Sequence, residues 1–214
     1  MRLGGVIVTV DISRPTIIFV VDTSGSMFGQ KIEAVNAAIA ECTEVIRNHN
    51  SSNSLQMGYV TFDEKWGDFV IKNDIGTINF KVKANADGFY NLTSFQCLYK
   101  GLERSLGDFN NSKSGLCLFL ITDGKPVDGG EYTEVLERVK NMDAFRNSER
   151  YVALVGNDVN GMDNDVLEFV GYKADRIVNL NDAASTLLKV SFLSGSNNSN
   201  NAAEAARYNT IFGD

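Results

Sequence analysis

The chain has 214 residues, of which 43% are hydrophobic and 22% are charged, and its formal net charge is -7. This composition is that of a globular protein, and the length suits one domain with a substantial core. The acidic balance and the lack of a basic stripe argue against nucleic-acid binding, and no apolar run is long enough for a membrane span.

The N-terminal sequence MRLGGVIVTVDIS covers residues 1–13. Its apolar run is short, Asp11 interrupts it, and no small-residue cleavage pattern follows, so it does not resemble a signal peptide. We interpret it as an N-terminal extension in which residues 5–12 form an additional edge strand. Without a secretion signal or a membrane span, the protein is expected to be cytoplasmic.

Short apolar runs recur along the chain and predict buried strands. They cover residues 16–21, 57–62, 116–121, 151–156 and 176–180. Runs of this length without polar alternation, rich in Val, Ile and Phe, are typical of parallel strands that helices cover on both faces.

The segments between these runs have the period of amphipathic helices. Apolar residues three and four positions apart form stripes that include Ile32, Val35, Ile39, Cys42 and Ile46 in 30–48, Phe95, Leu98, Leu102 and Leu106 in the next helix, and Val135, Val139 and Met142 in the third. Shorter helices are predicted over 163–170 and 182–192. Strands that alternate with helices predict a doubly wound α/β fold with a mostly parallel central sheet.

Two segments depart from this pattern. Residues 77–83, TINFKVK, alternate apolar and polar side chains, which predicts an antiparallel edge strand paired with residues 66–72. Residues 194–201, SGSNNSNN, read as a flexible polar linker, so the main domain is expected over 14–193, with a linker and short tail over 194–214. The end of that tail is interpreted as a short helix that docks or binds a partner, or as a disordered segment.

Polar side chains follow two of the predicted strands and precede one helix. Asp22 ends the first strand and is followed by Ser24 and Ser26, and Asp123 follows the strand at 116–121. Thr93 lies just before the helix that begins near Phe95. Because ligands of open parallel sheets bind outside the carboxyl ends of the strands, we expect these five side chains to converge.

Each of these residues alone also fits an ordinary structural role. Asp22 and Ser24 suit a turn or helix cap, and Asp123 with Gly124 suits a turn. Thr93 and Ser94 suit the N-cap of the following helix, and Ser94 is the expected cap. Asp128 is expected to order the loop 123–130. The combination of all five positions at neighbouring strand ends is what favours a binding site.

The chemistry of the set indicates a hard cation. Two carboxylates and three hydroxyls suit Mg2+ first, and then Mn2+ or Ca2+. A zinc site of the Cys/His kind has little to be built from, since the chain has three cysteines without a C-x-x-C pair and the single histidine His49. Because the set has only two carboxylates, the bound metal could accept another carboxylate from outside.

The sequences DTSGSM, LTS and LITDGKPVDG, in this order and spacing, resemble the von Willebrand factor A (VWA) domain and its metal-ion-dependent adhesion site over residues 14–193. Within that superfamily, DTSGSMFGQKIEAVN and TDGKPVD resemble the small bacterial TerY-like proteins associated with tellurium resistance. The resemblance implies a Rossmann-like VWA fold. It also implies that Ser24, Ser26 and Thr93 bind Mg2+ directly, and that Asp22 and Asp123 act mainly through bound water.

The resemblance further implies a non-enzymatic protein-interaction module of a bacterial stress or tellurium- and metal-resistance system. An acidic residue of a partner protein would bind the metal. A phosphatase or kinase of the same system is a candidate for this partner. No nucleic acid or membrane is expected as a partner. The alternative is a phosphatase-like hydrolase with Asp22 as nucleophile, but such enzymes need a second acid two residues on, where this chain has Ser24.

Overall fold

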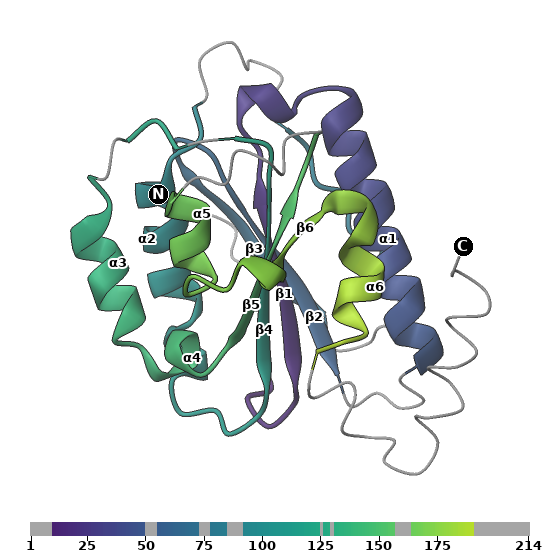
Figure 1. Ribbon diagram of the computed structural model, residues 1–214. Helices are drawn as coiled ribbons and strands as arrows, with labels where there is room; N and C mark the ends of the chain where they lie inside the picture. Colours follow the sequence, from purple (N-terminus) through teal and green to yellow (C-terminus); the bar gives the residue numbers. More distant parts are fainter. Residues whose placement is uncertain are drawn as a thin grey trace, which may run out of the picture.

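A six-stranded sheet with the order β3-β2-β1-β4-β5-β6 forms the centre of the molecule (Figure 1). The computed structural model describes residues 10–49, 55–72, 78–84, 92–124, 126–128, 131–156 and 164–190. The strands are β1 (Thr16–Asp22), β2 (Gln56–Phe62), β3 (Trp66–Lys72), β4 (Leu116–Thr122), β5 (Glu149–Leu154) and β6 (Ile177–Asn179). All neighbouring pairs are parallel except β2 and β3, which are antiparallel.

Helices cover both faces of this sheet (Figure 1). They are α1 (Gln30–His49), α2 (Phe95–Ser105), α3 (Thr133–Lys140), α4 (Asp143–Arg146), α5 (Asn164–Phe169) and α6 (Ala183–Leu187). The apolar stripes of α1 and α6 pack in one core layer with one face of the strands, and those of α2, α3, α4 and α5 pack in a second layer on the other face. The fold therefore confirms the predicted doubly wound α/β architecture with one antiparallel edge strand.

The central strands are the most deeply buried part of the chain. Every residue of β1 and of β4 is buried, in keeping with their continuous apolar sequences. β1 pairs with β2 on one side and with β4 on the other, so the strand order reverses at β1 and β4. This reversal is the position at which an open sheet offers a binding crevice.

The antiparallel edge strand is β3, and the strand predicted over 77–83 is wrong for the residues that the structure describes. Residues 78–84 form no strand, although Ile78, Phe80 and Val82 are buried and the residues between them are exposed. The segment packs against α1, where Asn36 Nδ2 donates to the carbonyl oxygen of Val82 (2.9 Å) and Val82 N–H donates to Asn36 Oδ1 (2.8 Å). Burial on one side produces the same alternation whether or not the backbone joins a sheet.

The segments predicted at the two chain ends lie mostly outside the described residues. The edge strand expected over 5–12 lies outside the described residues except at 10–12, where no strand occurs, and the linker and tail over 194–214 lie wholly outside them. Among the helices that the structure describes, none has both the length and the apolar character needed to cross a membrane.

Candidate metal centre

Asp22, the last residue of β1, lies at the bottom of the candidate site. Its side chain is 0% exposed because β1 runs between β2 and β4. Oδ1 accepts a hydrogen bond from the N–H of Ser24 at 2.9 Å. Oδ2 accepts hydrogen bonds from Thr122 Oγ1 at 2.7 Å and from Thr93 Oγ1 at 3.1 Å. Both oxygens are therefore held in fixed directions.

The short 3-10 turn η1 (Gly25–Met27) follows Asp22 and holds the two serines. Its Met27 side chain is fully buried, and Met27 N–H donates to the carbonyl oxygen of Ser24 at 3.0 Å. The hydroxyls of Ser24 and Ser26 lie 3.1 Å apart. At the end of the turn, Gly29 has φ +78, a conformation that favours glycine, and the chain then enters α1.

Thr93 reaches the site from the loop before α2. Its Oγ1 donates to Asp22 Oδ2 and contacts Ser24 Oγ, each at 3.1 Å. The carbonyl oxygen of Thr93 accepts a hydrogen bond from Val127 N–H at 3.0 Å, which joins this loop to the one after β4. A Cβ atom at Gly124 would lie 3.4 Å from Thr93 Oγ1, so glycine keeps the hydroxyl uncovered on that side.

Asp123 follows β4 and closes the site. Its side chain is 2% exposed, and Oδ1 accepts a hydrogen bond from Ser26 Oγ at 2.8 Å. Oδ2 forms an ion pair with the ammonium of Lys31, in the first turn of α1. The structure thus brings together all five side chains that the sequence singled out.

Sequence reasoning missed two neighbours of the site. Thr122 donates to Asp22, and Lys31 pairs with Asp123. Thr122 looks like the end of an apolar strand, and its role depends on how β4 lies beside β1. The position of Lys31 is a signal that can be seen in the sequence. It lies in the first turn of the helix that follows Asp22, so its cation is expected to lie near the two carboxylates of the site.

Among the residues of the site that the structure describes, negative charge exceeds positive charge. Burial raises the pKa of Asp22, hydrogen bonds from Thr122 and Ser24 oppose this effect, and the neighbouring charge of Asp123 adds to it. Lys31 supplies one positive charge against two carboxylates. An added cation would therefore find favourable electrostatics.

The donor atoms fit a hard metal ion. The part of the chain that the structure describes contains no group of three or more His, Cys, Asp or Glu side chains that would suit a metal. The converging set instead has two carboxylates and three hydroxyls, and Mg2+ prefers oxygen ligands of this kind.

Asp128 lies in the loop after β4 and caps α2, and the order that it is expected to give to the loop 123–130 stays a prediction. Its carboxylate accepts hydrogen bonds from Ser94 Oγ (2.7 Å), Phe95 N–H (3.2 Å) and Gln96 N–H (2.7 Å). Ser94 is itself the N-cap and accepts from Cys97 N–H at 3.1 Å. The helix that follows Thr93 is thus anchored at its first turn.

Replacing Asp128 with alanine is expected to lower the free energy of unfolding by about 2 kcal/mol, because it removes one cap acceptor and leaves backbone N–H groups of α2 without a partner. Urea denaturation followed by circular dichroism measures the change. Asp175→Ala, at an exposed position in the turn Ala174–Arg176, is the matched control and is expected to have little effect. Equal stability of the two variants would contradict the capping role.

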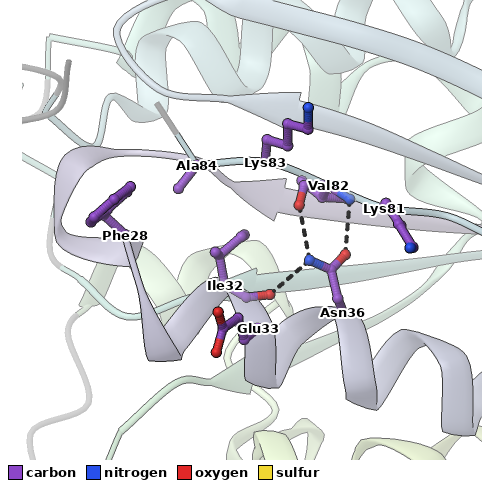
Figure 2. A pocket seen from close by; sticks show the side chains of 8 residues that line it. All are labelled: Phe28, Ile32, Glu33, Asn36, Lys81, Val82, Lys83 and Ala84. Carbon is purple, nitrogen blue, oxygen red and sulfur yellow. Dashed lines mark hydrogen bonds between the residues drawn. The ribbon is translucent and has the colours of Figure 1, made fainter. Parts of the chain in front are cut away.

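An open groove begins at Phe28, the residue that follows η1 (Figure 2). It has a volume of about 520 Å³ and lies between the first turns of α1 and residues 81–84. Phe28, 61% exposed, stands at one end, and the apolar side chains of Ile32 and Val82 lie along it. Figure 2 shows how the amide of Asn36 bridges α1 to Val82, which fixes the separation of the two walls.

The fold and the site define a doubly wound α/β domain with oxygen donors at the switch point of its sheet. A family model, von Willebrand factor type A domain, matches residues 16–203, and the chain belongs to this family. Domains of this family are protein-interaction modules, typically without enzymatic activity, and commonly bind divalent metals. Among curated proteins, no sequence matches the chain significantly.

Several solved structures share the fold. BatB from Bacteroides thetaiotaomicron is 14% identical with a TM-score of 0.59, over 85% of this chain and 99% of that one. A von Willebrand factor type A protein from Catenulispora acidiphila is 16% identical with a TM-score of 0.53, over 81% and 41% of the two chains. The manganese-loaded TRAP protein of Plasmodium vivax is 19% identical with a TM-score of 0.52, over 84% and 74%. At these identities the likeness concerns the fold.

Proposed function

We propose that this chain is a divalent-cation-dependent protein-interaction module with a metal-ion-dependent adhesion site. The observation that carries the proposal is the direct contact of five oxygen-donor side chains from three separate loops at the carboxyl ends of β1 and β4. The proposed ligands are Asp22, Ser24, Ser26, Thr93 and Asp123. The proposed ion is Mg2+, with Mn2+ or Ca2+ as substitutes.

The hydroxyls and the carboxylates would have different roles in holding the ion. The hydroxyls of Ser24, Ser26 and Thr93 would hold the ion without neutralising it, and Asp22 and Asp123 would act mainly through bound water. When bound, the ion supplies a positive centre that an acidic side chain of a partner can join. Asp22 is held by Thr122 and Ser24, which keeps its carboxylate directed toward the hydroxyls.

Binding suits this site better than catalysis by Asp22. A nucleophilic carboxylate needs an oxygen that substrate can reach, and Asp22 is buried with both oxygens engaged in hydrogen bonds. Position 24, where a phosphatase of this kind would need its acid, holds a serine hydroxyl that contacts Ser26 and Thr93. We therefore propose a binding role without enzymatic activity.

The partner is proposed to be a protein that offers an Asp or Glu, with no role for nucleic acid or a membrane. The resemblance of DTSGSMFGQKIEAVN and TDGKPVD to TerY-like proteins supports a bacterial stress or tellurium- and metal-resistance system. A phosphatase or kinase of the same system is a candidate partner. The described cysteines are free thiols, which agrees with a cytoplasmic location.

Calorimetric titration with Mg2+ tests the site. Thr93→Val removes one hydroxyl and keeps the size of the side chain, so we expect Mg2+ to bind at least about tenfold more weakly than to wild type. Thr43→Val is the matched control, since it removes a buried hydroxyl that bonds within α1, away from the site. Equal Mg2+ affinity in wild type and Thr93→Val would contradict the assignment of Thr93 as a ligand.

A further inference from the structure

Building on the metal site proposed above, we propose that Lys31 is a built-in counter-cation for Asp123. Its ammonium neutralises Asp123 while the divalent ion is absent and competes with that ion for the site. Lys31 would thus set how much Mg2+ is needed to load the site, without being a ligand.

The geometry singles out this ion pair. The ammonium of Lys31 contacts Oδ2 of Asp123, whose other oxygen accepts from Ser26, one of the proposed ligands. The Asp123 side chain is 2% exposed, whereas that of Lys31 is 44% exposed. The carboxylate is therefore fixed in the site, and the long lysine side chain is the partner that has room to move away.

Other ion pairs that the structure describes have a different character. Lys140, for example, pairs with Glu137 and Glu168 on the surface. Both of those carboxylates keep more contact with solvent than Asp123 does, and exposed ion pairs contribute little because water screens them. A buried carboxylate that loses its partner is costly, so Lys31 matters most when no metal is present.

The charges explain the competition. Asp22 and Asp123 bring two negative charges to the site, and Lys31 brings one positive charge. A dication would offset the two carboxylates, and a lysine ammonium held against Asp123 at the same time would repel the dication. Metal binding is therefore expected to release the lysine from Asp123.

The test compares Lys31→Met with wild type in two measurements. In calorimetric titration we expect Lys31→Met to bind Mg2+ about tenfold more tightly, because the competing charge is gone. In chelator, we expect its melting temperature to lie below that of wild type, because Asp123 has lost its partner, and saturating Mg2+ should narrow this difference.

Two further variants separate charge from shape and from general loss of an ion pair. Lys31→Arg keeps the positive charge and should match the Mg2+ affinity of wild type. Lys140→Met removes surface ion pairs of α3 and should leave Mg2+ affinity unchanged. If Lys31→Arg tightened Mg2+ binding as much as Lys31→Met, charge competition would be ruled out.

The outcomes distinguish this inference from the proposed function. If wild type binds Mg2+ and Lys31→Met binds it equally or more weakly, the role of Lys31 is overturned and the metal site stands. Mg2+ binding by Lys31→Met alone would support the inference strongly. If neither the wild type nor any of the variants binds Mg2+, both the site and the role of Lys31 are overturned.

Discussion

Asp22→Ala is expected to weaken Mg2+ binding by at least about a hundredfold and to abolish metal-dependent capture of a partner protein. The substitution removes a carboxylate charge, and charge count is a main determinant of affinity for hard cations. It also removes the acceptor that orients Thr93 and Thr122, so two hydroxyls lose their direction together. Calorimetric Mg2+ titration and pull-down with and without chelator measure the two effects.

Two comparisons make the result specific. Asp22→Asn keeps the size of the side chain and removes the charge, and it should lose most of the affinity while circular dichroism remains that of wild type. Asp63→Ala removes the carboxylate that follows β2, the strand beside β1, and should bind Mg2+ normally. Unchanged Mg2+ binding in both Asp22 variants would show that the five side chains do not form a metal site.

Phe95→Ala is expected to lower the free energy of unfolding by about 4 kcal/mol, the cost of emptying a large cavity in a packed core. Phe95 begins α2 and is fully buried, with its ring centroid 6.4 Å from that of Phe62 and 6.1 Å from that of Tyr99. The ring thus attaches the first turn of α2 to β2. Urea denaturation monitored by fluorescence and circular dichroism gives the change.

The appropriate control is Phe28→Ala, which removes the same side chain from an exposed position beside the groove. It should leave the free energy of unfolding nearly unchanged. Because Thr93 lies two residues before Phe95, the Phe95 variant is also expected to bind Mg2+ more weakly. A loss of stability in Phe95→Ala no larger than in Phe28→Ala would contradict its role as the anchor of α2.

Much of the fold was predictable because buried positions carry apolar residues, and their spacing can be seen in the sequence. β1 and β4 are apolar at nearly every position, since helices cover both of their faces, and the helices carry apolar stripes for the same reason. The strand predicted over 77–83 is wrong where the structure describes it, because residues 78–83 are buried on one side without joining the sheet. Periodicity reports which side chains are buried, and backbone pairing has no such signature.

The candidate site was predictable to the same extent and for a related reason. Parallel strands bring their carboxyl ends to one edge, so residues that follow β1 and β4 had to lie close together. The contacts of Thr122 and Lys31 depend instead on strand register and on the direction in which α1 leaves the turn. Strand register is not encoded in a local pattern of residue types, and Lys31 is signalled only by its place in the first turn of α1.

The long sequence separations within the site also determine when it can exist. Thr93 contacts Asp22 across 71 residues, and Ser26 contacts Asp123 across 97. Contacts of this range form only after the intervening loops have closed, which is slow compared with helix formation. During synthesis, the chain therefore has no complete site until β4 has left the ribosome and paired with β1, so metal binding would report the arrival of the native sheet.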